Sequence, residues 1–184
     1  RHGVWFKNAA AMEQAGHIDT VVLDKTGTLT QGKPDIAAIW TAPNISEDTL
    51  FQAAAAVEQH AAHPLAKAIV SHALDRNLAI PTATQPETEA GAGLQAQVEG
   101  IGLVKVGKPD FANFRLPETI TDDIWQIASL VAVSINGEAA GAFALADPLK
   151  PDSAEAIKRL HAHGIHVYIL SGDNAATVSH TAAQ

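Results

Sequence analysis

The chain has 184 residues, 47% of them hydrophobic and 17% charged, a composition that can bury a core and excludes a disordered protein. Its net charge of −8 argues against nucleic acid as a general partner, and the absence of cysteine excludes disulfides and thiolate metal sites. No apolar run approaches the roughly 18–20 residues that span a membrane as a helix.

The first part of the chain predicts a helix and then a buried strand. A short helix is expected from Asn8 to Ala15. The apolar run Val21–Leu23 predicts a strand of a parallel sheet, which places Asp24 at its carboxyl end, where open α/β sheets bind ligands. Gly27 then permits a tight turn whose N–H groups and threonine hydroxyls can face an anion.

A carboxylate beside an anion-binding turn suggests a specific chemistry. Such a group would be repelled by an anion unless it attacks that anion or holds a metal that bridges to it. Asp24 is therefore predicted to be a nucleophile that becomes an aspartyl phosphate.

Residues 34–141 predict a separate antiparallel α+β module, which begins after a break at Gly32–Pro34. Turn signals at Glu99-Gly100 and Asn136-Gly137 indicate two hairpins. The expected elements are a strand, two helices, a hairpin, a helix and a second hairpin, at residues 36–40, 46–59, 65–75, 94–106, 117–129 and 131–146. Residues 77–89 are expected to form a loop leading into a strand.

The parallel pattern returns at the end of the chain. A helix over 151–163 and an apolar strand over 165–170 lead to the turn Ser171–Asn174. Because this turn follows another parallel strand, it can lie close to Asp24. An ordinary helix cap is the alternative interpretation of the turn. We infer one discontinuous domain, 1–33 plus 142–184, interrupted by 34–141.

The residues from Asp24 to Thr30, DKTGTLT, resemble the phosphorylation signature of P-type ATPases, which are cation pumps. The resemblance implies an α/β fold, in which an incomplete haloacid-dehalogenase-like phosphorylation domain with a parallel sheet is interrupted by an antiparallel α+β nucleotide-binding domain. It also implies that ATP phosphorylates Asp24, and that Mg²⁺ is held by the Asp24 carboxylate and the Thr26 carbonyl.

Phosphate contacts are implied by the resemblance for residues of two loops. Ser171 stands where the family's Thr-Gly-Asp has threonine, and it keeps the hydroxyl. The implied phosphate-binding residues are Lys25, Thr26, Thr28, Ser171, Gly172 and Asp173.

Two residues of the inserted module resemble the adenine site of the heavy-metal branch. His63-Pro64 and the upstream Glu58 match, whereas Ala61 and Ala62 replace Ser and Glu. An imidazole can stack on adenine, and a carboxylate can accept a hydrogen bond from its exocyclic amine. The alternative for His63 is a surface histidine that precedes a helix-starting proline.

Glycines supply the rest of the implied nucleotide site. Gly91 and Gly93 match the family's Gly-x-Gly turn, where a nucleotide can approach the backbone, although a plain turn is the alternative. Gly107 is followed by Lys108 instead of the family's Asn, which puts one ribose or phosphate contact in question. Asp147 lies in a stretch that resembles the family's hinge, and it is expected to tether that hinge or to contact nucleotide; an ordinary loop acid is the alternative.

Position 26 separates a pump from a soluble phosphatase of the same fold. Such phosphatases carry a second Asp there as general acid and base, whereas Thr26 cannot exchange a proton near neutral pH. The aspartyl phosphate is therefore expected to persist. The predicted function is the ATP-binding and phosphorylation region of a heavy-metal exporter. The alternatives are a soluble haloacid-dehalogenase-type phosphatase and a catalytically silent nucleotide-binding module.

The resemblance also implies the context of the chain. Residues 3–14, GVWFKNAAAMEQ, look most like bacterial copper exporters, which favours Cu(I) as the transported ion. The chain is expected to be a cytoplasmic piece of an integral membrane protein, with actuator and membrane domains, the ion site and further Mg²⁺-binding aspartates elsewhere. Alone, it is expected to bind ATP weakly and to turn over little or none.

Overall fold

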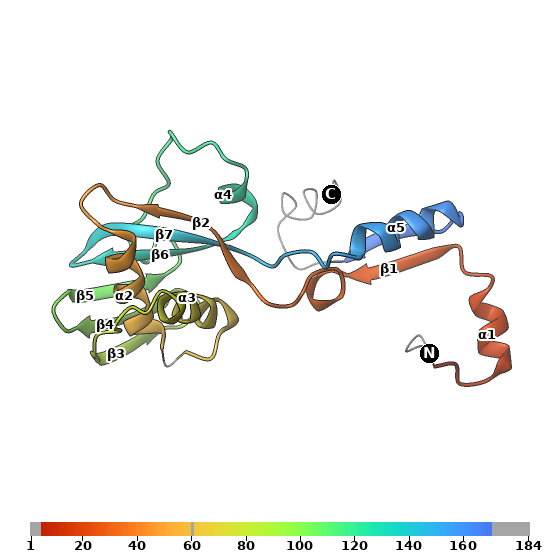
Figure 1. Cartoon of the computed structure of the whole chain (residues 1–184), viewed down its shortest axis with the longest axis horizontal. Helices are drawn as coiled ribbons and strands as arrows, with labels where there is room; N and C mark the ends of the chain where they lie inside the picture. Colours follow the sequence, from red (N-terminus) through yellow and green to blue (C-terminus); the bar gives the residue numbers. More distant parts are fainter. Residues whose placement is uncertain (1–4, 60, 171–184) are drawn as a thin grey trace. The chain divides into compact units, whose positions relative to one another are not determined.

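The computed structural model describes residues 5–59 and 61–170 and divides into two compact units (Figure 1). One unit includes the residues up to Gly32 and those from Leu149 onward, and the other runs from Lys33 to Pro148. Within the described residues, no helix is long and apolar enough to cross a bilayer.

The first unit contains a parallel pair of strands. These are β1 (Thr20–Asp24) and β8 (His166–Leu170), with Asp24 opposite Leu170. Two helices complete its described part, α1 (Ala9–Ala15) and α5 (Ser153–Ala162), and α5 packs against β8. The parallel pairing agrees with the pattern of the sequence.

The expectation that β1 is buried is wrong for the described residues. Val22 on β1 and Tyr168 on the paired strand β8 are each 61% exposed. The described part of this unit supplies only two strands and one helix packed on them, which leaves alternate residues of both strands facing outward.

The second unit is built on one antiparallel sheet in the order β2-β7-β6-β5-β4-β3. The two predicted hairpin turns are present, with positive φ at Gly100 and at Asn136 and Gly137. The strands are β2 (Asp35–Thr41), β3 (Ala83–Glu89), β4 (Gly93–Val98), β5 (Gly102–Gly107), β6 (Ser129–Ile135) and β7 (Glu138–Ala146).

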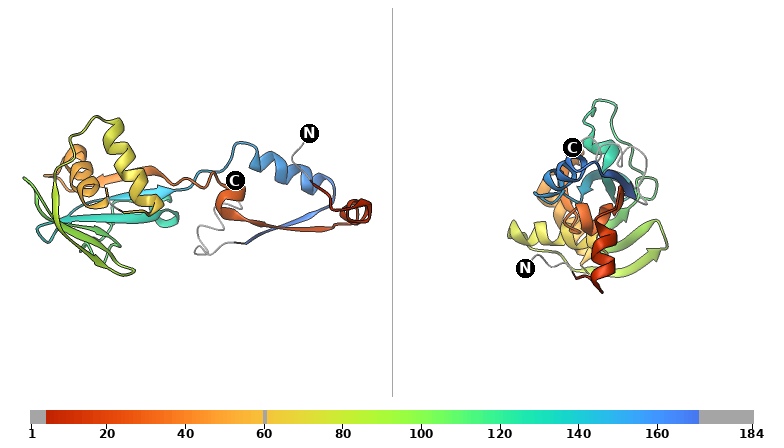
Figure 2. Two further views of the ribbon diagram at one scale, coloured as in Figure 1. Left: turned by 90° about the horizontal axis from the view of Figure 1, so that it is seen from below. Right: turned by 90° about the vertical axis from the view of Figure 1, so that its right-hand side faces the viewer.

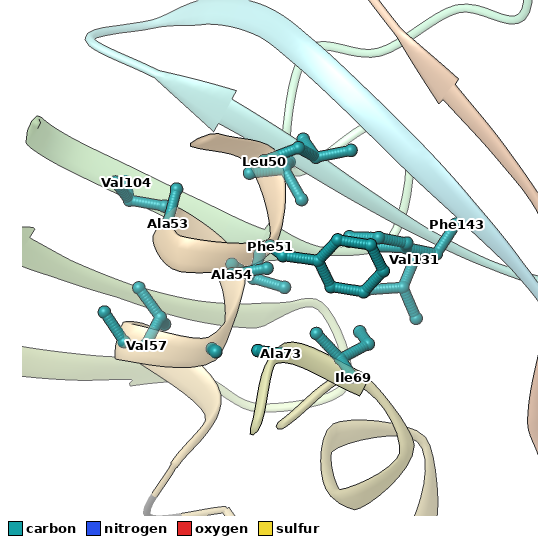
Figure 3. Packing of buried hydrophobic residues seen from close by; sticks show 14 of the residues in the cluster. Leu50, Phe51, Ala53, Ala54, Val57, Ile69, Ala73, Val104, Val131 and Phe143 are labelled. Atoms are coloured by element: carbon teal, nitrogen blue, oxygen red, sulfur yellow. The ribbon is translucent and has the colours of Figure 1, made fainter. Parts of the chain in front are cut away.

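Two helices cover one face of this sheet, as the left view of Figure 2 shows. They are α2 (Glu47–Glu58), which is capped by the Ser46 hydroxyl, and α3 (Pro64–Asp75). Four consecutive alanines of α2, residues 53–56, are fully buried, so the helix backbone can lie close to its neighbours. Phe51 of α2 packs on Phe143 of β7 with ring centroids 5.0 Å apart (Figure 3).

The opposite face of the sheet carries a second, smaller core. Trp125 of α4 (Ile124–Ile127) and Phe114 pack there against alanines of β6 and β7. The ring centroids of Phe114 and Trp40 lie 5.4 Å apart. The small side chains on this face make room for these bulky aromatic rings.

Two expectations for the second unit are corrected by the structure. The helix expected over 117–129 is reduced to α4: residues 117–123 are turns and irregular backbone, and the chain enters β6 at Ser129. Residues 83–89, expected as part of a loop, form the edge strand β3. A register shift between Thr84 and Glu87 accommodates Pro86 there, as is usual for proline in sheets.

The second unit also ends later than the predicted boundary between residues 141 and 142. Strand β7 continues to Ala146, where it pairs with Asp35 at the start of β2, and the unit extends to Pro148. The assignment of the two units to phosphorylation and nucleotide binding stays a prediction at this stage.

Candidate functional site

Asp24 lies at the carboxyl end of β1 with its side chain exposed. Its carboxylate makes no capping hydrogen bond to the N–H groups of the loop that follows. Its partner in the sheet is Leu170, the last residue before Ser171 in the sequence. Ser171, Gly172 and Asp173 lie outside the described residues, so their approach to Asp24 stays a prediction.

The loop after Asp24, Lys25–Leu29, contains a type II turn. Thr26 has φ −73° and ψ 121°, and Gly27 has φ 75° and ψ −10°. A side chain at Gly27 would meet no atom within 4 Å, so the positive φ, not the space, requires glycine there. Thr26 and Thr28 on either side are exposed and accessible to a ligand.

Thr30, which is 2% exposed, is buried and hydrogen-bonds to two residues of this loop. Its hydroxyl accepts a hydrogen bond from the Gly27 N–H at 3.1 Å and donates to the Lys25 carbonyl at 3.2 Å. Its own N–H also donates to the Lys25 carbonyl, at 3.1 Å. Lys25 itself is only 8% exposed, in contrast to the exposed threonines, and its implied phosphate contact stays a prediction.

Two residues at or just before the start of α5 also hold the loop, and sequence reasoning gave neither of them this role. The Lys150 ammonium donates to the Gly27 carbonyl at 2.8 Å, and the Ser153 hydroxyl donates to the Leu29 carbonyl at 2.7 Å. No local signal could have found these contacts, because more than 120 positions separate the partners in the sequence.

Asp147 ties the two ends of the second unit together. Its Oδ1 accepts a hydrogen bond from the backbone N–H of Lys33 at 3.1 Å. Lys33 is the first residue of this unit, and Asp147 precedes its last residue, Pro148. The contact supports a tether between the two ends of this unit, and the expected contact of Asp147 with nucleotide stays a prediction.

Glu58 ends α2 and is an unusual buried acid. It is only 7% exposed, and burial raises the pKa of its carboxyl to about 7. Among the described residues, no donor pairs with this carboxyl. A carboxyl in this state can donate or accept a hydrogen bond near neutral pH, which suits recognition of a polar group.

His63 is the residue that caps α3. Its Nδ1 accepts a hydrogen bond from the Leu65 N–H at 3.2 Å, and Pro64 begins the helix. The structural alternative considered for this histidine is therefore present. The side chain is nevertheless exposed, and in the neutral ring its proton lies on Nε2, which leaves that nitrogen as a donor.

The three predicted glycines lie at neighbouring ends of β4 and β5. Gly93 pairs with Gly107 across the two strands. A Cβ on Gly93 would lie 2.3 Å from the Val106 carbonyl oxygen, and one on Gly107 would lie 2.3 Å from that of Ala92. Gly91, with φ 76°, forms the adjoining turn and has open space beside it. Gly93 and Gly107 therefore permit close strand contact, whether or not nucleotide binds there.

Lys108, which departs from the family pattern, keeps a backbone role at this corner. Its N–H donates to the Ala92 carbonyl at 2.8 Å, so the loop after β5 stays next to the Gly91–Gly93 turn whatever the side chain is. Helix α2, which carries Glu58, packs against both β4 and β5. The acid and the glycines thus belong to elements in direct contact.

Replacing Gly93 with alanine should destabilise the second unit by about 2 kcal/mol or more, because the new methyl would overlap the backbone of β5. Gly91→Ala is the matched control, because it adds only the strain of a left-handed backbone, roughly 1 kcal/mol. Urea unfolding of both variants measures the difference. Equal losses would contradict a packing role for Gly93.

Comparison with known proteins places the chain in a family. A family model of haloacid dehalogenase-like hydrolases matches residues 18–184. The chain is 55% identical to a probable cation-transporting ATPase of Haemophilus influenzae, over 99% of this chain and 25% of that protein. It is 44% identical to a zinc/cadmium/lead-transporting P-type ATPase of Escherichia coli, over 95% of this chain and 24% of the relative.

A copper relative and two solved structures extend the comparison. Identity is 37% to a probable copper-exporting P-type ATPase V of Mycobacterium tuberculosis, over 99% of this chain and 24% of that protein. A zinc-transporting PIB-type ATPase in the E2.Pi state matches with TM-score 0.82 and 40% identity, over 100% of this chain and 30% of its own. The catalytic domain of the CPx-ATPase CopB-B, in a structure on conformational changes upon nucleotide binding, matches with TM-score 0.72 and 28% identity. The match covers 96% of this chain and 62% of that chain. The chain spans about a quarter of the length of these three relatives.

Proposed function

Because the chain belongs to the haloacid dehalogenase-like hydrolases, with heavy-metal P-type ATPases as its relatives, we propose that it is the catalytic region of such a pump. In this proposal the second unit binds ATP and Asp24 accepts the terminal phosphoryl group. The observation that carries it is the exposed Asp24 carboxylate, which stands at the end of a parallel strand and beside a turn with two exposed threonines. Acid-quenched phosphorylation of the full-length protein with radiolabelled ATP is the experiment that tests it.

The proposed reaction is an in-line displacement on the γ-phosphorus of ATP. A carboxylate oxygen of Asp24 forms the new P–O bond while the bond to the departing ADP oxygen breaks. Thr28 would contact the transferring group, and its exposure on the same loop supports this role. Buried Thr30 supports that loop through its bonds to the Gly27 N–H and the Lys25 carbonyl.

The residues present fit a magnesium ion that is shared with the nucleotide. Mg²⁺ is commonly bound by one or two carboxylates together with substrate phosphates, and not by a protein cage. Asp24 offers an exposed carboxylate and Thr26 a carbonyl in the adjoining turn, and the described residues contain no cluster of three or more acidic or histidine ligands. The ion would offset the charge of the phosphates as Asp24 attacks.

Thr26 favours a pump over a soluble phosphatase. A threonine hydroxyl at this position cannot take a proton from water, so the aspartyl phosphate would last until another group activates its hydrolysis. Such a lifetime allows the phosphorylated state to drive a conformational change. Rapid turnover of para-nitrophenyl phosphate by the full-length protein would instead favour the phosphatase, and nucleotide binding without a phosphoenzyme would favour a silent module.

His63→Asn should weaken binding of a non-hydrolysable ATP analogue by about tenfold, the loss expected when an aromatic ring no longer stacks on a base. Asparagine is a good helix N-cap, so the variant removes the imidazole and keeps the cap of α3. Calorimetric titration of this chain measures the affinity.

The control for this prediction is His161→Asn, the same change at an exposed residue of α5 in the other unit. It should leave the affinity unchanged. An affinity of His63→Asn equal to that of the control would show that this histidine only caps the helix.

The transported ion is proposed to be a heavy-metal cation, with two candidates. Residues 3–14 favour Cu(I), as expected from the sequence. Zn²⁺, Cd²⁺ and Pb²⁺ are the second set of candidates, because the relative named for zinc, cadmium and lead is 44% identical and the copper relative 37%. Comparing Cu(I) and Zn²⁺ as stimulators of ATP hydrolysis by the full-length protein in membranes distinguishes them.

The remaining partners follow from the same proposal. The chain would act as a cytoplasmic part of a bacterial membrane protein, together with actuator and membrane domains of the same polypeptide. The ion would bind in that membrane region, and Mg²⁺-binding aspartates outside this sequence would complete the catalytic centre.

A further inference from the structure

We propose that Lys150 is a positioning residue for phosphoryl transfer, which it serves by fixing the loop that follows Asp24; this role rests on the proposed function. The Lys150 ammonium donates to the Gly27 carbonyl at 2.8 Å. Its backbone N–H donates to the Leu29 carbonyl, also at 2.8 Å. One residue therefore holds two carbonyls of the loop.

The loop needs such support because its turning residue is glycine. Gly27 has no side chain to limit its dihedral angles, and nothing packs within 4 Å of where a Cβ would be. The residues on either side, Thr26 and Thr28, supply the proposed metal and phosphate contacts. A rotation at Gly27 would therefore displace both contacts relative to Asp24.

The bond from Lys150 restrains that rotation. A hydrogen bond from an ammonium is stronger than one between neutral groups, and it fixes the orientation of the peptide that joins Gly27 to Thr28. It also places a positive charge next to a loop that would face the negatively charged phosphates of ATP.

Other contacts in this region also hold the loop, so the effect of the Lys150 side chain can be separated from that of packing. Ser153, which is 6% exposed, joins the start of α5 to the end of the loop, and the bridge between Thr30 and Leu149 joins the segment just before α5 to it. These contacts do not involve the Lys150 side chain. Lys150 itself is only partly buried, so its side chain can be shortened or neutralised without leaving a cavity in a core.

The experiment compares Lys150→Met, Lys150→Arg and Lys158→Met in the full-length protein. Lys158 is an exposed lysine of α5, so its change to methionine removes the same charge from the same helix region. The rate of phosphoenzyme formation is measured as a function of ATP concentration, and amide hydrogen exchange is measured at Thr30, whose N–H bonds within the loop.

Lys150→Met should lower the maximal rate of phosphoenzyme formation by about 10- to 100-fold, the effect of a small misplacement of reacting groups. The ATP concentration for half-maximal rate should stay within about twofold, because nucleotide affinity resides in other residues. Exchange at Thr30 should accelerate. Lys150→Arg, which can still donate to the Gly27 carbonyl, should restore most of the rate, and Lys158→Met should behave as wild type.

Three results would overturn the proposal. The first is a rate for Lys150→Met equal to that of Lys158→Met. The second is a loss in ATP affinity equal to the loss in rate, which would make Lys150 a nucleotide contact. The third is wild-type protein without any phosphoenzyme, which would refute the proposed function itself and is recognised because every variant then lacks the intermediate too.

Discussion

Asp24→Asn should abolish the phosphoenzyme, with a loss of at least about 1,000-fold in its formation from ATP. An amide oxygen is a poor nucleophile, and no other carboxylate lies in the loop Lys25–Leu29 that could replace it. Because Asp24 is exposed and its side chain caps nothing in the loop, the substitution should leave the fold of the first unit unchanged.

The measurement is acid-quenched trapping of radiolabel in the full-length protein, followed by release with hydroxylamine, which cleaves acyl phosphates. Asp19→Asn is the matched control, because Asp19 is an exposed acid just before the other end of β1. ATP affinity provides a second readout. Removal of a negative charge facing the phosphates should keep it equal or raise it, so a variant that no longer binds ATP would point to misfolding. Label retained by Asp24→Asn would refute the assignment of the acceptor.

Glu58→Gln should stabilise the second unit at pH values above 7 by an amount on the order of 3 kcal/mol. Burial raises the pKa of this carboxyl from 4.5 to about 7 in the folded protein. Below pH 4.5 the group is protonated in both states, and burial of its charge costs nothing. Between the two pKa values the folded state binds the extra proton, so stability falls as pH rises. The loss of folding stability is complete once the carboxyl has ionised in the folded protein. Glutamine carries no charge at any of these pH values.

Hydrogen exchange of the buried amides of α2 measures this prediction, because these amides report on the second unit alone. The wild-type free energy of opening should decline between about pH 5 and pH 8, and that of Glu58→Gln should stay level. Glu99→Gln, at an exposed turn residue, is the control and should follow the wild type. Parallel pH profiles for wild type and Glu58→Gln would show that the carboxyl does not titrate at a buried site.

The stability lost at Glu58 bears on function. A buried acid without a partner among the described residues is costly when ionised, and an isosteric amide would remove the cost of burying that charge. Proteins retain such groups mainly at ligand sites, where the ligand supplies the missing partner. In the proposed function that partner is the exocyclic amine of adenine.

Turns and strand ends that depend on a few neighbouring residues could be predicted from the sequence. The Asn136-Gly137 hairpin, with both residues at positive φ, and the turn at Gly27 follow from backbone preferences that a few residues determine. The place of Asp24 at a strand end likewise follows from three apolar residues before it.

Features that depend on distant residues were missed or misjudged. Lys150 and Gly27 meet only because the chain returns to the first unit after the second is complete. The helix expected over 117–129 is present only at Ile124–Ile127, and at its end the pairing of Ser129 with Leu145 draws the chain into the sheet. Pro86 suggested a loop, yet a bulge at the sheet edge accommodates it within β3. In each case a tertiary contact outweighed the local preference.

The hydrogen bond between Asp147 and the Lys33 N–H has a consequence for how such a protein can be rebuilt. Because the two ends of the Lys33–Pro148 unit lie next to each other, its removal would leave the first unit with only a short gap in the chain. A short glycine linker should therefore replace it, and homologous inserts should be exchangeable at the same junction. If the proposed function holds, swaps of this kind would transfer nucleotide preference without changing the phosphate acceptor.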